Sequence, residues 1–419
     1  MSRFTSVTLA VVVIVMLSWT LLAPAQTPEP IRIGVVYPLS GSQALPVEGL
    51  VTGHKIAADE IMKAGGLLGR RIEFIVRDDA GNPELTTRFT RELVLRNNVD
   101  WVFTGFGSAV ALAGTAVARE LKTPTFIFGG KTEKVTTEDW NPYVFRYQVT
   151  STAEARAAAA IVAKEMVKGV KAPKIYWISW DYEYGRSLHG PFMARIKELI
   201  PDVKIAGEAW PRTGETDYGP FINHMLAVQP DVVVNAIWGG GVVSLLKQGT
   251  AVGLWNKAGF IGLAELAGIE YRTAIGKDMP PGAWGNTYDD AIWPDNEGQR
   301  KFYEQYHNFT GKPSPPTGFA SSGYYVMQFV AAGMRKAGTT KPDAVIKAME
   351  GLSLDTYWGP MSIRDFDHQV TSGQIWAPML TKQGLAYTVL DAKRARFISS
   401  TPDLFTKDEW LAKRKAAGK

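Results

Sequence analysis

The sequence predicts an α/β protein with two lobes, each built on a doubly wound parallel sheet. Segments typical of buried strands alternate with amphipathic helical segments, which is the pattern of parallel strands covered by helices on both faces. The chain has 419 residues, 46% of them hydrophobic, which is more than one core usually holds. The alternation also restarts after a break near residue 141, so two similar lobes are expected.

The first set of elements opens the mature chain. Strands are expected at 31–37, 72–76 and 101–104 from short apolar runs bounded by turn residues. The helix that follows the second strand begins with Asn82-Pro83, a good N-cap and a proline suited to the first helical position. The helix at 108–121 has an apolar stripe at helical spacing, and a strand at 123–128 follows it.

The second set begins beyond a strand at 141–146. Ser151-Thr152-Ala153-Glu154 reads as a capping box, in which the glutamate side chain reaches back to the helix start. Further strands are expected at 174–179, 203–209, 231–237 and 260–262, with helices at 185–200, 218–228 and 242–252 between them.

The last part of the chain is expected to return to the first lobe. Two long helices at 297–310 and 318–336 lack companion strands in the second set, a strand or hairpin follows at 377–390, and a terminal helix lies near 407–416. The expected division is 1–25 signal peptide, 26–149 first part of lobe I, 150–285 lobe II, 286–372 second part of lobe I, and 373–419 return to lobe II and C-terminal tail.

The N-terminus predicts export. Arg3, a largely apolar run at 7–22 and then Ala23-Pro24-Ala25 form the three parts of a secretory signal peptide. A retained membrane anchor is the alternative, but the run is short for a spanning helix. The chain has no cysteine, which excludes disulfides, thiolate metal sites and lipid attachment after the apolar run. A protein of the periplasm without a lipid anchor is expected.

The segment from Trp101 to Lys131 carries the clearest chemical signal. A strand leads into Gly105-Phe106-Gly107-Ser108 at a helix start, where backbone N–H groups and a hydroxyl favour a small anion. The next strand ends in Gly129-Gly130-Lys131. The sequence therefore predicts a clamp for a ligand carboxylate.

Nothing in the sequence indicates catalysis or nucleic-acid binding. The 5 histidines are scattered, and no metal-ligand spacing, nucleophile elbow or phosphate-binding loop occurs. No catalytic residue, metal or cofactor is expected. The formal charge of +5 is spread along the chain, and Lys413-Arg414-Lys415 is interpreted as a solvated helix end rather than a nucleic-acid patch. A monomer is expected.

The chain resembles the type I periplasmic solute-binding proteins of ABC transporters, specifically the leucine/isoleucine/valine-binding (branched-chain amino acid) family. The resemblance implies two lobes joined by three crossovers and a ligand in the cleft, beyond the carboxyl ends of the strands. Its markers are the strand ending in Pro38-Leu39-Ser40-Gly41, Gly65-Gly66 with Gly69, Asp78-Asp79 with Pro83, the Gly105–Ser108 turn, Asp181 with Tyr184-Gly185, Gly262, and Gly359-Pro360.

The resemblance also implies site residues. Ser108 would bind the ligand carboxylate, and Gly129 and Gly130 would let the ligand approach the backbone. Lys131 departs from the family pattern: it either serves a second carboxylate or a more acidic ligand, or lies on the cleft rim. In lobe II and the rest of the wall the candidates are Tyr184, Trp238, Glu265 as the partner of a ligand ammonium, and Phe319.

The function that follows is capture of an amino acid or related small carboxylate by hinged closure, for delivery to an inner-membrane ABC permease. Two alternatives remain open on the sequence. One is a different ligand, namely an aromatic acid, an amide or urea. The other is a ligand sensor that feeds a membrane receptor.

Overall fold

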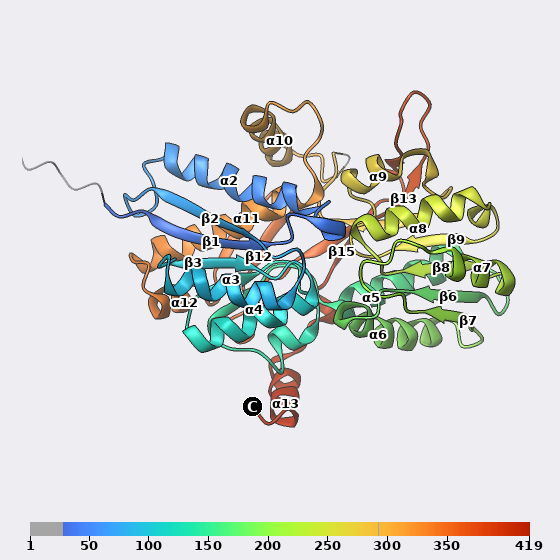
Figure 1. Ribbon diagram of the computed structural model, residues 1–419, viewed down its shortest axis with the longest axis horizontal. Coiled ribbons are helices and arrows are strands. Elements are labelled where there is room, and N and C mark those ends of the chain that lie inside the picture. The colour runs from blue at the N-terminus through green and yellow to red at the C-terminus, as the bar shows by residue number, and fades with distance from the viewer. Residues whose placement is uncertain (1–27, 292) are drawn as a thin grey trace, which may run out of the picture.

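The computed structural model describes residues 28–291 and 293–419, so the predicted signal peptide at 1–25 lies outside the described residues. Two sheets form two lobes that lie side by side (Figure 1). The first sheet is parallel, with the strand order β2-β1-β3-β4-β5. Its strands are β1 (Ile31–Tyr37), β2 (Ile72–Asp78), β3 (Trp101–Thr104), β4 (Thr125–Ile127) and β5 (Val144–Arg146).

Helices cover both faces of this sheet because side chains alternate along its strands. Ile33 and Val35 of β1 belong to the core shared with α2 (Val47–Lys63) and α11 (Gly318–Ala337). Val36 points to the other face, where it packs with Leu93 of α3. That face carries α3 (Pro83–Leu95) and α4 (Ser108–Leu121), which pack against each other.

The second sheet is mixed, with the order β14-β13-β10-β9-β8-β6-β7 and with β15 beside β13. The strands from β6 to β10 are parallel, and β13 to β15 are antiparallel additions. The strands are β6 (Lys174–Ile178), β7 (Lys204–Ala209), β8 (Val232–Asn235), β9 (Gly259–Gly262), β10 (Trp284–Thr287), β13 (Gly373–Leu380), β14 (Val389–Leu390) and β15 (Arg396–Ser399). Its helices are α5 (Ser151–Ile161), α6 (Glu183–Leu199), α7 (Gly219–Val228), α8 (Gly239–Ala251) and α9 (Ile269–Ile275).

The chain passes between the two sheets after β5, after β10 and before β13. The segment between the last two passages contains α10 (Glu297–Thr310), α11, α12 (Pro342–Met349) and the hairpin of β11 (Ser353–Thr356) and β12 (Gly359–Ser362). Because α11 packs against α2, this segment completes the first lobe. The predicted class, a two-lobed α/β fold with parallel sheets, is confirmed.

The elements match the prediction closely, with one informative error. The helices predicted at 108–121, 297–310 and 407–416 have those bounds. The prediction of a capping box from Ser151 to Glu154 is wrong. The N-cap of α5 is Thr150, and its hydroxyl accepts a hydrogen bond from the Ala153 N–H. The Glu154 side chain instead points into the molecule, as described below. The elements α9, β10, α12 and β15 and the β11–β12 hairpin were not predicted.

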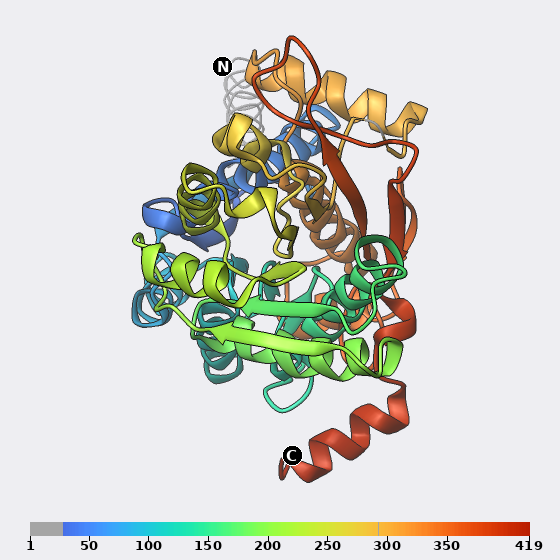
Figure 2. The same ribbon diagram turned by 90° about the vertical axis from the view of Figure 1, so that its right-hand side faces the viewer.

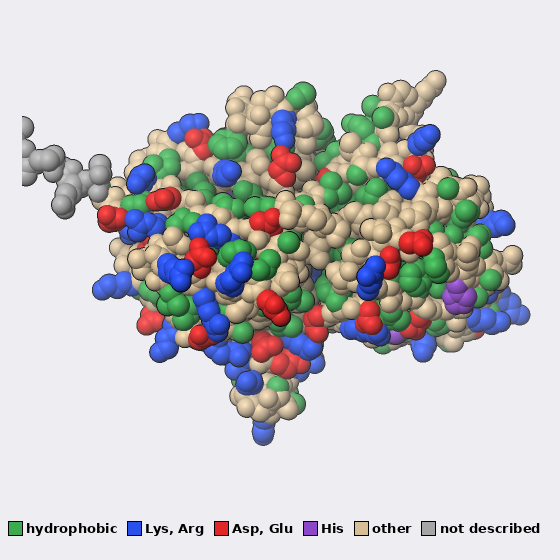
Figure 3. Space-filling model, in the orientation of Figure 1, with side chains coloured by type: hydrophobic (Ala, Val, Ile, Leu, Met, Phe, Trp, Pro, Cys, Tyr) green, Lys and Arg blue, Asp and Glu red, His purple; other side chains and the backbone are tan. Residues whose placement is uncertain are grey.

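The C-terminal helix α13 (Lys407–Ala416) lies at the end of the segment drawn in red and extends beyond the body of the molecule (Figure 2). Arg414 stacks over the rings of Trp140 and Trp410 and donates to the carbonyl groups of Thr137 and Trp140. The interpretation of 413–415 as a solvated helix end is therefore wrong for Arg414, which docks the helix. On the face of the molecule in Figure 3, basic and acidic side chains are interspersed. No helix of the described ranges is long and apolar enough to cross a membrane.

Substitution of Gly53 in α2 tests how closely this helix packs on α11. A Cβ added to Gly53 would lie 1.9 Å from the carbonyl oxygen of Ala320, so Gly53→Ala forces the two helices apart. We expect a loss of about 1–3 kcal/mol in the free energy of unfolding by urea titration. Gly190→Ala in α6 is the matched control, because no residue other than its chain neighbours in the helix lies within 4 Å of the added Cβ. Pro191 follows it and offsets the gain in helix propensity, so its effect should stay below about 1 kcal/mol. Equal effects of the two substitutions would contradict this packing.

Candidate functional site

A cavity lies between the two lobes, where the carboxyl ends of strands from both sheets meet. This is where open parallel sheets bind ligands. The cavity holds about 340 Å³ of space not filled by protein atoms, part of it open to solvent. It is lined by Pro46, Phe106, Gly107, Gly129, Lys131, Gln148, Tyr182, Tyr184, Trp238, Ala264, Glu265, Tyr271 and Phe319.

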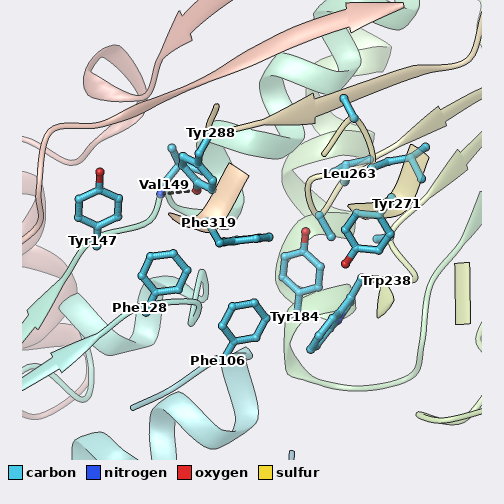
Figure 4. Close-up of a cluster of buried hydrophobic side chains, with 14 of the residues drawn as sticks. Phe106, Phe128, Tyr147, Val149, Tyr184, Trp238, Leu263, Tyr271, Tyr288 and Phe319 are labelled. Atoms are coloured by element: carbon cyan, nitrogen blue, oxygen red, sulfur yellow. Dashed lines mark hydrogen bonds between the residues drawn. The ribbon is translucent and has the colours of Figure 1, made fainter. Parts of the chain in front are cut away.

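Six of the 13 lining residues are aromatic, and Figure 4 shows five of them: Phe106, Tyr184, Trp238, Tyr271 and Phe319. The ring of Phe106 lies 5.8 Å from Trp238 and 5.4 Å from Phe319. The polar tips of the larger rings are already bonded: the Trp238 indole donates to the Tyr182 hydroxyl at 2.6 Å, and the Tyr271 hydroxyl accepts from the Gly239 N–H. Both hydroxyls accept in these bonds, so the surface offered to a ligand there is aromatic with two O–H donors, which suits a flat ring.

The polar part of the wall is built around one ammonium group. Lys131 Nζ donates to Glu154 Oε1 at 2.7 Å and to Glu265 Oε1 at 2.5 Å, and its side chain is 3% exposed. The same nitrogen lies 5.6 Å from the centre of the Tyr184 ring. Lys131 extends from the end of β4 in the first lobe, whereas both glutamates belong to the second lobe. The ion pairs thus join the two lobes inside the cavity.

Glu154 connects four elements. Besides Lys131, it accepts hydrogen bonds from the Tyr184 hydroxyl at 2.7 Å, the Asn286 amide at 2.7 Å and the Ala264 N–H at 3.1 Å. These donors come from α6, from β10 and from the loop after β9. Glu265 is held in turn by the Gln374 amide at 2.8 Å. Both carboxylates are fixed by neighbours as well as by the lysine.

The cluster contains two carboxylates and one ammonium, and the pKa values of all three groups are shifted. Burial alone would lower the pKa of Lys131, but the two carboxylates outweigh burial and raise it. Burial alone would raise the pKa of Glu154, yet the charge and hydrogen bond of Lys131, with those of Tyr184 and Asn286, hold it below its usual range. Burial and the Glu154 charge raise the pKa of Glu265 to about 7, because one ammonium cannot neutralise two carboxylates.

The loop that carries Glu265 has an unfavourable backbone conformation. Ala264 and Glu265 have φ values of 58° and 63°, in the left-handed region that side chains other than glycine rarely adopt. Each such residue costs on the order of 1–3 kcal/mol and persists only where its surroundings fix it. Here the Ala264 N–H is bound to Glu154, and the Glu265 N–H is bound to Asn286 Oδ1 at 2.8 Å. The acidic pair is thus a built feature of the cavity.

A buried arginine, Arg146, fixes the backbone of the loop that carries Lys131. The Arg146 guanidinium donates to the carbonyl groups of Gly130, Lys131 and Thr132. It also bonds the side chains of Thr136 and Gln369. The position of the ammonium is therefore set by the backbone beneath it and not by the ion pairs alone.

Besides the tyrosine hydroxyls, two donors of the wall have no acceptor among the described residues. An ammonium has three N–H groups, and Lys131 uses two of them on described residues. The side chain of Gln148 lines the cavity and is buried, yet its amide forms no hydrogen bond with any residue of 28–291 or 293–419. Both donors are available to a ligand carboxylate or hydroxyl.

The structure brings six of the eight predicted site residues to the cavity wall: Gly129, Lys131, Tyr184, Trp238, Glu265 and Phe319. Ser108 and Gly130 are not in the wall. Ser108 is the first helical residue of α4 rather than its cap, and its hydroxyl accepts from the Thr132 N–H at 3.3 Å. A Cβ on Gly130 would lie 2.1 Å from that of Ala111, so this glycine allows the loop to pack on α4. Lys131 was expected either inside the cleft or on its rim, and in the structure it lies inside the cleft.

The residues of the site that sequence reasoning missed include Phe106, Gln148, Glu154, Tyr182 and Tyr271. Glu154 stands where a capping box matches by residue type, and only the tertiary structure shows that its side chain turns inward. Tyr182 lies within the Asp181–Gly185 motif, so the sequence could have indicated it as a site residue. Within the described part of the chain, no group of three or more His, Cys, Asp or Glu side chains is arranged to hold a metal ion.

Further contacts across the cleft surround the cavity. Glu183 of α6 accepts from the Thr132 hydroxyl and the Lys134 ammonium of the first lobe. Gly239, with φ at 59°, lies so close to the first lobe that a Cβ would meet the Ser42 carbonyl oxygen at 2.1 Å. The lobes are in contact on both sides of the aromatic wall.

Comparison with known proteins agrees with this architecture. The family model described as periplasmic binding protein matches residues 30–380. Leu/Ile/Val-binding protein homolog 8 of Brucella abortus (strain 2308) is 25% identical over 336 residues, which cover 77% of this chain and 81% of that protein.

Solved structures share the fold. A solute-binding protein of an ABC transporter from Rhodopseudomonas palustris BisB5, in complex with 3,4-dihydroxybenzoic acid, superposes with a TM-score of 0.77 at 23% identity, over 89% of this chain and 99% of that one. An amino acid ABC transporter substrate-binding protein from Pseudomonas fluorescens Pf-5 gives 0.77 at 19% identity, over 93% and 99%. The match of the family model over most of the chain shows that this protein belongs to the periplasmic binding protein family.

Proposed function

We propose that this protein is the solute-binding component of an ABC importer and that its solute is a small aromatic carboxylic acid. The observation that carries the proposal is the cavity itself, in which six aromatic side chains face a buried ammonium that is already paired with both acidic residues. The protein would act in the periplasm after removal of 1–25 and deliver its ligand, as a monomer, to an inner-membrane permease.

The wall and the free donors suit the two ends of such a ligand. Its ring would lie among Phe106, Trp238 and Phe319, where apolar area is removed from water and ring contacts add about 0.5–1.5 kcal/mol each. Its carboxylate would accept from the third N–H of Lys131 and from the Gln148 amide. Hydrogen bonds that involve a charged group are worth about 1.5–3 kcal/mol, so these two contacts would orient the ligand.

The structural neighbours support this ligand class. Proteins of the same fold were solved with 3,4-dihydroxybenzoic acid, benzoate and 4-hydroxybenzoate. An aliphatic α-amino acid is the second candidate, favoured by the names of the Leu/Ile/Val-binding relatives. It fits the cavity less well, because Glu265, the expected partner of a ligand amine, is bound to Lys131. The proposal assigns no chemical step and no catalytic residue to the cavity.

A melting screen of the purified mature chain tests the proposal. Benzoate, 4-hydroxybenzoate and 3,4-dihydroxybenzoate are compared with leucine, isoleucine, valine and benzamide. A ligand at 100 times its Kd adds about 2.7 kcal/mol to the free energy of unfolding, so a binder gives a clear rise in Tm. We expect the rise with at least one of the aromatic acids. A rise with the aliphatic amino acids alone, or with benzamide alone, would replace the proposed ligand class.

A further inference from the structure

We propose that Lys131 is a specificity-determining residue whose ammonium permanently fills a cation subsite of the cavity, so that the protein rejects ligands carrying an amine. The inference takes from the proposed function only that ligands bind in this cavity. The subsite consists of the Glu154 and Glu265 carboxylates and the face of the Tyr184 ring. We call these three groups the cation subsite.

The cation subsite has the composition that an ammonium ion requires. Two carboxylate oxygens lie 2.7 Å and 2.5 Å from Lys131 Nζ, which is the distance of charge-assisted hydrogen bonds. An aromatic face 5.6 Å away adds a cation–π contact. None of these groups is specific for lysine, because a primary amine on a ligand presents the same charged NH₃ group.

A second ammonium finds most acceptors of the cation subsite in use. Glu154 already accepts from Tyr184, Asn286 and the Ala264 N–H, and Glu265 accepts from Gln374. An incoming amine would either displace a bonded donor or use Glu265 Oε2, and in both places it would lie beside the charge of Lys131. Below about pH 7, where Glu265 is largely protonated, the cluster has no net negative charge to offset this repulsion, so the lysine both occupies the cation subsite and disfavours competitors.

Lys131 belongs to the first lobe, whereas its three partners belong to the second lobe. A free ammonium ion can therefore take the place of its side chain without a change in the partners. Glu154, Glu265 and Tyr184 stay in place in the second lobe when the Lys131 side chain is shortened. Asn286 and the Ala264 N–H hold the Glu154 carboxylate, Gln374 holds that of Glu265, and the Glu265 N–H is bound to Asn286. Lys131→Ala would leave a space with the shape of n-propylammonium, which is the lysine side chain beyond Cβ. The two exposed acceptors would then bind that ion.

Chemical rescue tests the proposal. The Tm of Lys131→Ala should rise with n-propylammonium in a saturable way and should not respond to n-propanol or tetramethylammonium, which lack the charge or the N–H donors. Lys131→Met is the matched control, because methionine removes the charge but fills the space, and it should show no rescue. The wild-type Tm should not respond to n-propylammonium. Absence of rescue in folded Lys131→Ala, or equal rescue of Lys131→Met, would overturn the proposal.

Ligand selection gives a second readout. In Lys131→Ala the affinity for an aromatic acid should fall roughly 10- to 100-fold, as expected for one lost charge-assisted contact, while 2-phenylethylammonium should become a ligand. If Lys131→Ala does not fold, the double variant Lys131→Ala with Glu265→Gln carries one buried carboxylate instead of two and takes its place. The rescue with n-propylammonium needs no aromatic acid, so it can fail or succeed independently of the proposed solute.

Discussion

Replacing Glu154 with alanine is expected to cost about 3–5 kcal/mol of the free energy of unfolding. The substitution removes an acceptor used by Lys131, Tyr184, Asn286 and the Ala264 N–H. Lys131 keeps Glu265, but the other three donors remain buried without a partner, and each such group costs about 1–3 kcal/mol. Urea or guanidinium titration followed by circular dichroism measures the loss.

Two controls separate the hydrogen bonds from helix capping and from surface charge. Glu154→Gln keeps an oxygen acceptor at the same place, so its loss should be smaller than that of alanine. Glu120→Ala breaks the exposed pair with Arg91 and should cost less than about 1 kcal/mol. A loss for Glu154→Ala as small as that for Glu120→Ala would show that Glu154 is only a residue of the first helical turn, as its sequence position suggests.

Binding of an aromatic acid is expected to weaken as the pH rises above about 7. Burial and the Glu154 charge raise the pKa of Glu265 to about 7, so this carboxyl is largely protonated below that pH and ionised above it. A bound carboxylate adds a third negative charge beside a single ammonium, which favours the protonated form further. Binding at high pH must therefore take up a proton, and the affinity falls by up to about tenfold per pH unit.

The contribution of Glu265 to the free energy of unfolding also falls as the pH rises. The folded-state pKa of Glu265 lies above the value of about 4.3 for an unfolded chain, so the contribution of this group to stability falls as the pH rises from about 4.3 to 7. The charged and titratable groups that act on it are Lys131, Glu154 and the nearby Glu270, with the hydroxyls of Tyr184 and Tyr288 beside them.

Glu265→Gln removes the titrating group and keeps the contact with Gln374 possible. Its affinity for the acid should be nearly independent of pH between 6 and 9 and should exceed that of the wild type at pH 9. Calorimetry in two buffers of different ionisation enthalpy counts the protons taken up at each pH. A wild-type affinity that is flat over this range, or a variant with an unchanged pH profile, would contradict the role given to Glu265.

The fold was predictable because its signals are local. The helix at 108–121 follows from a glycine-flanked serine and an apolar stripe, and the helix at 297–310 from an asparagine cap and a clear amphipathic pattern. The β11–β12 hairpin was missed because its strands are short and only Met361 among their residues is buried, which leaves no apolar pattern to detect. The two lobes followed from repetition of the strand–helix pattern along the chain.

The site was predictable in its location but not in its chemistry. Strand ends marked Gly129, Tyr184 and Trp238, because ligands of parallel sheets lie there. The pairing of Lys131 joins it to residues 23 and 134 positions away, and no spacing rule links such positions. The predicted carboxylate clamp combined Ser108 with the backbone around Gly129 and Gly130. Ser108 and Gly130 pack α4 on its loop outside the cavity wall, and a role of theirs in binding stays a prediction. The capping-box pattern hid Glu154 for the same reason, since local sequence does not show which way a side chain turns.

The most direct test of the proposed ligand class is a pair of calorimetric titrations with 3-phenylpropanoate and phenylalanine. The two compounds share the ring, the chain and the carboxylate, and they differ in the α-amino group. With the cation subsite filled by Lys131, we expect 3-phenylpropanoate to bind at pH 6 and phenylalanine to bind at least about tenfold more weakly, which is a difference of about 1.4 kcal/mol. Tighter binding of phenylalanine would show that the cavity accepts a ligand amine and that the protein is an amino acid receptor.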